Sequence, residues 1–288
     1  MTAPSDGAFP ELATDIPTPA RMYDYTLGGK DNYEVDRAAV LGAMPHFPEG
    51  VDNARDNRLF LYRAVRYLAR DAGIRQFLDL GSGLPTADNV HQVAQQFQPD
   101  AHVVYVDNDP TVLTHGRALL TKDQGTTVLA ADMIEPEKIL SHADTRRLLD
   151  FSAPVAVLFL SVGHSIDDDA TVRRMLATVR EEVVAGSYLA YTQMTSLDPA
   201  LAEQGRALAR SHGYTFHVRT QAEVVELLAD PQLEPVEPGL VDVREWRPDP
   251  DQPPLPQVDE PLRPYLGASR TMEYRGGEFG GVLRVTAG

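Results

Sequence analysis

The chain has 288 residues, 43% of them apolar, which is enough to bury the core of one large domain or two small ones. Its 42 acidic residues outnumber its 26 basic residues, and the net charge of −16 disfavours nucleic acid and anionic membranes as partners. The absence of cysteine excludes disulfides, thiolate metal sites and a cysteine nucleophile, whereas a metal site made of His and carboxylates stays open on composition alone.

The N-terminal stretch, residues 1 to about 20, is rich in proline and small polar residues, which is typical of a flexible or draped arm. Residues 1–15 lack the basic start and apolar core of a signal peptide. No window approaches the roughly 18 continuous apolar residues that a membrane helix needs. We therefore expect a soluble, cytoplasmic protein.

A helical pattern begins near Asp52, the expected N-cap, and stops at Gly73. Its apolar face is formed by residues that recur at helical spacing: Leu61, Val65, Leu68, Ala69 and Ala72. The helix leads directly into the predicted first strand, an apolar run within residues 76–83 that ends in Asp79, two positions before a Gly-x-Gly turn.

Predicted helices and strands then alternate along the chain. The further strands are residues 103–106, 127–130, 155–160 and 188–192. The helices between them are marked by Val90, Val93, Ala94 and Phe97, by the start Asp109-Pro110, and by the stripe Val172, Met175, Leu176, Val179 and Val183. This alternation indicates a mostly parallel sheet with helices on both faces.

The C-terminal third mixes helices with shorter strands. We predict a helix over Pro199–Ser211, a short extended run over residues 215–218 and a helix that starts at the capping box Thr220-x-x-Glu223. Residues 240–246 and 280–285, or alternatively 265–269, are expected to be strands of a terminal hairpin. Residues 247–264 are too rich in proline for a helix or central strand, so we expect an exposed excursion.

The turn after the first strand carries the first part of a candidate ligand site. Gly81 and Gly83 allow the backbone to turn sharply and approach a ligand that a Cβ would push away, with Ser82 between them. Asp79, at the strand end, either orients this turn or accepts from an ammonium group of the ligand. The ligands of open parallel sheets bind beyond the carboxyl ends of the strands, where these residues lie.

Acidic residues also follow the next two predicted strands. Asp107, followed by Asn108, is placed to accept both hydroxyls of a ribose. Asp132 is placed either to accept from an adenine amino group, with Met133 against the ring, or to cap a loop or helix. Acids after three successive strands favour a nucleotide-containing ligand.

Two such ligands are to be compared, a nicotinamide dinucleotide and S-adenosylmethionine. The dinucleotide fingerprint has a third glycine and places a pyrophosphate on the helix N-terminus, whereas this chain has Pro85 and Thr86 there. An acid just before the glycines disfavours a pyrophosphate and suits a cationic amino-acid moiety. The pattern therefore favours S-adenosylmethionine.

The chain resembles the actinobacterial S-adenosylmethionine-dependent methyltransferases once catalogued as a domain of unknown function. The resemblance covers nearly the whole chain and is carried by residues 19–33, 54–58, 77–86, 104–110, 186–189, 237–241 and 246–248. The chain departs from the family's usual pattern at Val162-Gly163-His164-Ser165, and its tail, residues 270–288, extends beyond the usual ending.

The resemblance implies a Rossmann-like class I methyltransferase fold with a seven-stranded, mostly parallel sheet. Residues 1–72 would form an N-terminal arm and helical cap over the cofactor site, and residues 73–288 the Rossmann-like domain. It implies the cofactor more strongly than the acceptor, because the natural substrates of the family are poorly defined.

Three further residues are candidates for the site. Tyr25 either contacts ligand or belongs to a structural lid, and Arg58 either pairs with the methionine carboxylate or forms a surface salt bridge. His164 is the best placed general base if the acceptor needs one, and otherwise it is a cap or structural histidine. The residues Asp167–Asp169 more readily cap the following helix than bind a metal, and we predict no metal site.

Our hypothesis is a methyltransferase that uses S-adenosylmethionine to methylate a small molecule by in-line displacement. A protein that binds S-adenosylmethionine or S-adenosylhomocysteine without catalysis is the alternative. A nicotinamide-dependent reductase is a third and weaker hypothesis. The sequence predicts neither the acceptor nor the oligomeric state.

Overall fold

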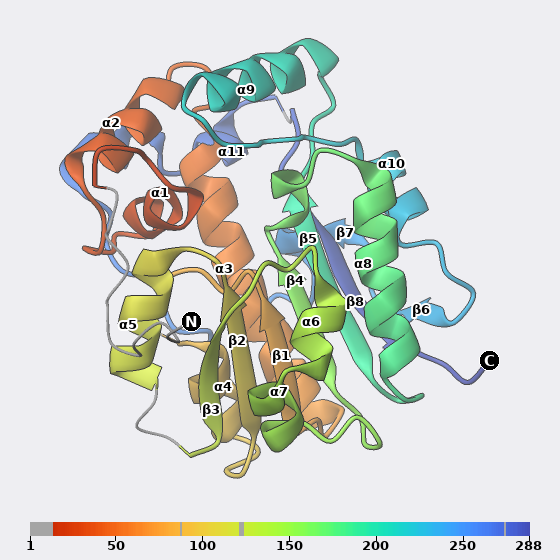
Figure 1. The fold of residues 1–288 in the computed structure, drawn as a ribbon. Helices are drawn as coiled ribbons and strands as arrows, with labels where there is room; N and C mark the ends of the chain where they lie inside the picture. Colours follow the sequence, from red (N-terminus) through yellow and green to blue (C-terminus); the bar gives the residue numbers. More distant parts are fainter. Residues whose placement is uncertain (1–13, 87, 121–123, 274) are drawn as a thin grey trace, which may run out of the picture.

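The computed structural model describes residues 14–86, 88–120, 124–273 and 275–288, and its centre is a mixed sheet (Figure 1). Within these residues the sheet has eight strands, seven of them in the order β3-β2-β1-β4-β5-β8-β6, while β7 pairs with β8 beside this path. The strands are β1 (Gln76–Leu80), β2 (His102–Asp107), β3 (Thr126–Ala130), β4 (Ala156–Leu160), β5 (Tyr188–Met194), β6 (Leu233–Pro235), β7 (Val241–Asp242) and β8 (Glu278–Val285).

Strands β1 to β5 pair in parallel. The chain adds β2 and β3 on one side of β1 and then crosses to the other side of β1 to add β4 and β5. Strand β8 runs antiparallel between β5 and β6. The predicted Rossmann-like α/β fold with a mostly parallel sheet is therefore confirmed, whereas the expected number of seven strands was too low, because the short strand β7 adds to the sheet beside β8. The switch in strand order opens a crevice beyond the carboxyl ends of β1 and β4, which is where such sheets bind ligands.

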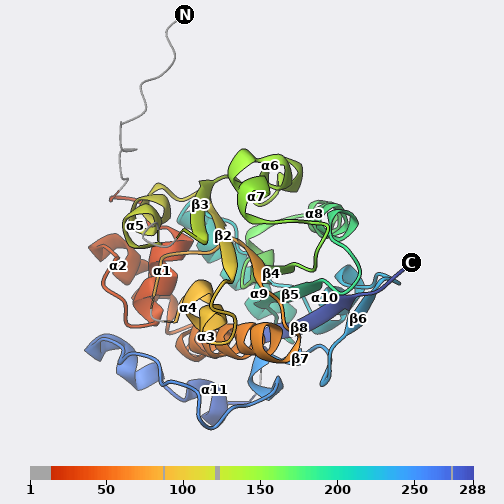
Figure 2. The ribbon, with the colours of Figure 1, turned by 90° about the horizontal axis from the view of Figure 1, so that it is seen from below.

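Helices cover both faces of the sheet, as Figures 1 and 2 show. On one face α6, α7, α8 and α10 pack against the sheet, and on the other α3 and α4 do so. The helices are α1 (Pro19–Thr26), α2 (Glu34–Ala43), α3 (Gly50–Arg66), α4 (Val90–Gln95), α5 (Pro110–Leu120), α6 (Pro136–Ser141), α7 (Ala143–Leu148), α8 (Asp169–Glu182), α9 (Pro199–Ser211), α10 (Gln221–Leu227) and α11 (Ala268–Thr271). None of the described helices is both long and apolar enough to span a membrane.

Helix α3 begins before the position that the sequence predicts. Its N-cap is Glu49, so the prediction that Asp52 caps it was wrong. The Asp52 carboxylate instead accepts hydrogen bonds from the backbone N–H groups of Gly267 and Ser269, both at 2.9 Å. The predicted stop is confirmed, because a π-helical turn after α3 leads into Gly73 with a φ of +72°.

A cap formed by α1, α2 and the start of α3 lies above the carboxyl ends of the strands, beside α9 (Figure 1). Its small apolar core consists of Tyr25, Val40, Met44, Val51, Val258 and Leu262. The predicted exposed excursion over residues 247–264 is thus wrong in part, since Val258 and Leu262 are buried in the cap. Their apolar side chains pack in one cluster with residues of the distant N-terminal helices.

Other local predictions had mixed outcomes. Residues 215–218 form no strand, and residues 265–269 are mostly helical, in a 3-10 turn (Glu260–Tyr265) and α11. Only Val241–Asp242 of the strand predicted over 240–246 pairs with β8, because a 3-10 turn (Val243–Glu245) follows. Strand β6 was not predicted. Residues 1–13 of the predicted arm lie outside the described residues.

Candidate active site

A cavity of about 680 Å³ lies beyond the carboxyl ends of β1 to β4. We call it the strand-end cavity. It brings together almost every residue that the sequence singled out: Arg58, Asp79, Gly81, Ser82, Gly83, Asp107, Asn108, Asp132, Met133 and His164. Tyr25 is the exception, since it is 2% exposed and packs in the apolar core of the cap, and Tyr23 lines the cavity instead.

The glycine turn is closely packed at one of its two glycines. Gly81 has a φ of +72°, and a Cβ there would lie 2.6 Å from Cγ1 of Val162 and 3.3 Å from Sδ of Met133. Gly83 has a φ of +66°, with open space around the position of a Cβ. The turn therefore needs glycine at 81 for room and conformation, and at 83 for conformation alone.

The turn is tied to the end of the neighbouring strand through Asp107. The N–H of Gly83 donates to Oδ2 of Asp107 at 2.8 Å, and the N–H of Asp109 donates to Oδ1 at 2.9 Å. Burial raises the pKa of Asp107, and these donors oppose that rise. Each carboxylate oxygen keeps a second lone pair, so the side chain is oriented and still able to accept from a diol.

Asp79 is a buried acid at the end of β1, 5% exposed. Burial raises its pKa to about 7, the positive charge of Arg58 opposes this rise, and the negative charge of Asp107 adds to it. Arg58 is itself held in the wall, where its Nη2 donates to the carbonyl of Asp88 at 2.9 Å. A bound cationic group beside Asp79 would favour its ionised form.

Asp132, another lining residue of the cavity, is held by two hydrogen bonds. Its Oδ1 accepts from the N–H of Ile134 at 3.1 Å, and its Oδ2 accepts from Nδ2 of Asn108 at 3.3 Å. Met133 follows directly and lies against the turn at Gly81. A polar acceptor and an apolar side chain thus lie next to each other.

A second cavity, of about 230 Å³, lies between the cap, α9 and residues 214–218. We call it the apolar cavity, because it is lined mainly by apolar side chains, among them Met22, Val40, Met44, Phe47, Leu201, Leu208, Phe216 and Val218. The two cavities are neighbours, since both are lined by Pro19, Tyr23, Ser161, His164 and Ser165.

The chain matches the model of the S-adenosyl methyltransferase family over residues 5–284. It belongs to this family. The crystal structure of a candidate methyltransferase from Thermobifida fusca YX is 42% identical, covers 98% of this chain and 100% of its own, and superposes with a TM-score of 0.81. That of a DUF574 family protein from Streptomyces avermitilis MA-4680 is 34% identical, with 96% and 100% covered and a TM-score of 0.80. No curated protein matches the chain.

These matches confirm the family that the sequence resembles. The positions of individual side chains then indicate the role of each residue in this family member.

His164 lies in the 3-10 turn after β4, Gly163–Ser165. Its ring packs on Phe216 with centroids 4.9 Å apart, and its Nδ1 accepts from the N–H of Met194 at 3.4 Å.

The environment of His164 does not favour its predicted role as a base. Burial, with a smaller contribution from the charge of Arg219, lowers its pKa to about 4. Since Nδ1 accepts a hydrogen bond, the proton of the neutral ring resides on Nε2. A proton donor in either cavity would therefore meet no free lone pair on this ring.

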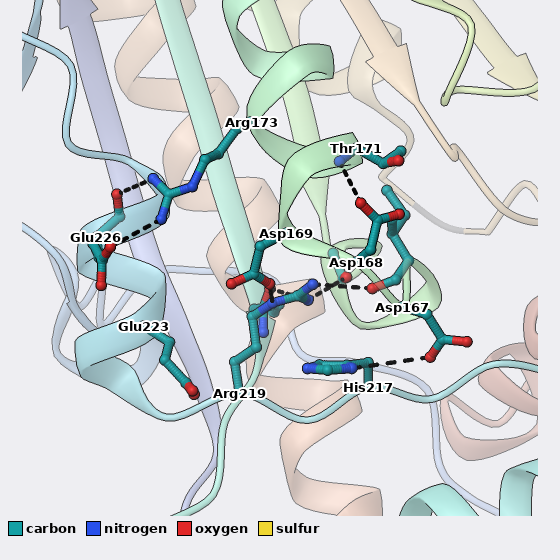
Figure 3. Close-up of polar contacts among 12 residues, drawn as sticks. Asp167, Asp168, Asp169, Thr171, Arg173, His217, Arg219, Glu223 and Glu226 are labelled. Atoms are coloured by element: carbon teal, nitrogen blue, oxygen red, sulfur yellow. Dashed lines mark hydrogen bonds and ion pairs between the residues drawn. The ribbon is translucent and has the colours of Figure 1, made fainter.

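Arg219 holds the loop that carries His164 (Figure 3). It is 1% exposed and donates to the carbonyls of Gly163 and Ile166 at 2.8 and 3.0 Å, and to Oδ1 of Asp169 at 2.8 Å. Asp168 caps α8 by accepting from the N–H of Thr171, as predicted. Asp168 is thus engaged with the helix, Asp169 with Arg219, and Asp167 with His217.

A chain of hydrogen bonds through mostly buried side chains runs along the shared wall of the cavities. Asn57 donates to the hydroxyl of Tyr23 at 3.0 Å and accepts from Thr192 at 2.7 Å. Thr192 also accepts from the N–H of Ser161 at 2.8 Å, and the Ser161 hydroxyl donates to Oε1 of Glu278 at 2.6 Å. Ser161 has a φ of 58°, which is strained for a residue other than glycine.

Sequence reasoning missed the wall residues Tyr23, Ser161 and Glu278. Ser161 directly follows β4, so the rule that directs attention to strand ends could have found it. Tyr23 lies in the N-terminal segment that carries the family resemblance. Glu278 gave no signal, because it lies far along the chain and just before the strand predicted over residues 280–285.

Proposed function

We propose that the protein transfers a methyl group from S-adenosylmethionine to a small, mainly apolar molecule. The observation that carries this proposal is that the strand-end cavity, which is lined by several charged side chains, shares a wall with the apolar cavity. Methyl transfer is an in-line displacement, so the nucleophile must reach the methyl group from the side opposite the sulfur. Adjacent cavities of different polarity suit two substrates that meet at such a wall.

The residues of the strand-end cavity fit S-adenosylmethionine group by group. Asp107 is oriented to accept from the two ribose hydroxyls, and Asp132 with Met133 suits the amino group and the ring of adenine. Asp79 suits the ammonium group and Arg58 the carboxylate of the methionine moiety. When bound, the sulfonium supplies a methyl group attached to a good leaving group.

The alternatives fit these contacts less well. A protein that only binds the cofactor has no use for an apolar cavity next to it. A nicotinamide dinucleotide would place its pyrophosphate near Asp79, Asp107 and Asp132, whose charges repel it.

Calorimetric titration of the full chain with S-adenosylmethionine, S-adenosylhomocysteine and NAD⁺ tests the proposal. We expect saturable binding of the first two and about 10- to 100-fold weaker binding to Asp107→Ala, which loses charge-assisted hydrogen bonds. Asp167→Ala is the matched control: it removes the same charge from a side chain that is 71% exposed and lines neither cavity. Preference for NAD⁺, or equal binding to Asp107→Ala and wild type, would contradict it.

A further inference from the structure

Glu278, the first residue of β8, is a buried acid in the wall of the apolar cavity, 4% exposed. One of its oxygens, Oε1, accepts the hydrogen bond from Ser161. The other, Oε2, is buried and has no hydrogen-bond partner in the described part of the chain. Buried polar atoms are nearly always satisfied, so an unsatisfied carboxylate oxygen beside a cavity points to a missing ligand.

Two other acids lie near Glu278. Asp242 and Asp56, from β7 and α3, add to the effect of burial and raise the pKa of Glu278 to about 8, while the hydrogen bond from Ser161 opposes this rise. No described cation forms an ion pair with Glu278. The nearby guanidinium groups pair with other acids: Arg244 with Asp242, Arg270 with Asp56, and Arg275 with Glu49. A cation in the cavity would therefore be attracted to this carboxylate.

Glu278 also lies next to the shared wall. Glu278 lines the apolar cavity and not the strand-end cavity. Ser161, to which it is hydrogen-bonded, lines both cavities. A group bound at Oε2 is thus one hydrogen-bonded side chain away from the strand-end cavity. This is the end of the apolar cavity at which an acceptor must present its nucleophile.

We propose that the acceptor is a small apolar amine whose nitrogen binds Oε2 of Glu278, and that Glu278 is the catalytic base for its methylation. This inference rests on the function proposed above and names the substrate class. The cavity of about 230 Å³ lies below the range of about 300–1,000 Å³ common for drug-sized ligands, which favours an amine with a single ring or a short alkyl chain.

The chemical step balances with these groups alone. Glu278 takes one proton from the bound ammonium, which frees the lone pair on nitrogen. This lone pair forms the bond to the methyl carbon, while the carbon–sulfur bond breaks and its electron pair stays on sulfur. The product leaves as a methylated ammonium ion, and Glu278 then passes its proton to water. A carboxyl with a raised pKa is well matched to holding this proton near neutral pH.

A hydroxyl acceptor would satisfy Oε2 but would leave an ionised Glu278 without a counter-charge, because Arg244 and Arg270 are paired with Asp242 and Asp56. The observations therefore favour an ammonium ion over an alcohol. This preference can be measured directly with probes of equal shape.

The test is calorimetric titration of the full chain, saturated with S-adenosylhomocysteine, with three amines and their matched alcohols: 2-phenylethylamine and 2-phenylethanol, benzylamine and benzyl alcohol, and hexylamine and hexanol. We expect at least one amine to bind about 10-fold or more tightly than its alcohol. Glu278→Gln should remove this preference and leave alcohol binding unchanged. Glu226→Gln, at a side chain that is 75% exposed, is the matched control and should behave as wild type.

Proton release gives a second readout. Most Glu278 carboxyls are protonated at pH 7 before binding, so amine binding should release about one proton, measured in two buffers of different ionisation enthalpy. Glu278→Gln should release none, and Glu278→Asp, which keeps the charge, should retain the preference for amines at lower affinity.

The two proposals fail in different ways. Absence of S-adenosylhomocysteine binding by the wild type would overturn the proposed function. Normal binding of S-adenosylhomocysteine, with no amine preferred over its alcohol, or with the preference retained in Glu278→Gln, would overturn the assignment of Glu278. S-adenosylhomocysteine binding also reports whether each variant is folded.

Discussion

Replacing Gly81 by alanine tests the packing of the turn between β1 and α4. A left-handed conformation costs a non-glycine residue about 1–2 kcal/mol, and the smaller entropy of the unfolded alanine chain returns about 0.4–1 kcal/mol. The new Cβ would lie 2.6 Å from Val162, and such overpacking costs about 1–3 kcal/mol more. Gly81→Ala should therefore lower the free energy of unfolding by about 2–4 kcal/mol.

The chain offers two matched controls for this prediction. Gly73 and Gly83 have φ values of +72° and +66°, close to that of Gly81, but a Cβ at either position meets no atom within 4 Å. Each alanine variant should thus lose only about 1 kcal/mol. Urea denaturation without ligand measures all three. If Gly83→Ala and Gly81→Ala lose the same free energy, the argument from crowding at Val162 is refuted.

Two further predictions concern pH and the loop after β4. Because the folded-state pKa of Asp79 is raised from 3.8 to about 7, the native state binds the extra proton in this range, and the free energy of unfolding should fall as pH rises through it. Asp79→Asn should flatten this fall in urea titrations at pH 5 and 8, and an unchanged slope would contradict the pKa. Within the described residues, Arg219→Ala removes the only side-chain donor to the carbonyl of Ile166, one of the two donors to the carbonyl of Gly163, and the partner of Asp169, and should cost about 2–4 kcal/mol. Arg173→Ala, which breaks an exposed pair, should cost less than about 1 kcal/mol in the same assay, and equal losses would refute the distinction.

The sheet and the strand-end cavity could be predicted from sequence because their signals are local. The apolar run before the Gly-x-Gly turn lies in β1, and the helix predicted from about Pro199 to Ser211 is α9. The rule that ligands bind beyond the carboxyl ends of parallel strands then predicted a single site for Asp79, Asp107 and Asp132. All three residues line the strand-end cavity. Periodicity and chain order were sufficient for each of these steps.

The features that were missed depend on contacts between distant parts of the chain. Asp52 resembles a helix cap, yet its acceptors are used by backbone groups more than 200 residues away. Glu278 escaped notice for a geometric reason. Strand β8 is antiparallel to β5, with Met194 opposite Glu278, so its first residue lies at the edge where the parallel strands end. A search limited to the residues that follow each strand does not find Glu278, because this residue begins its strand.

The late position of the segment that completes the cap has a consequence for biosynthesis. Val258 and Leu262 belong to the same apolar core as Tyr25, Val40 and Met44, although more than 200 residues separate the two groups. Domains generally fold as units during synthesis, and contacts of long sequence separation form slowly. On the ribosome, part of the apolar surface of the N-terminal helices therefore stays exposed to solvent until nearly the whole chain has emerged. We expect the N-terminal helices of the nascent protein to resist proteolysis only after Val258 and Leu262 have emerged.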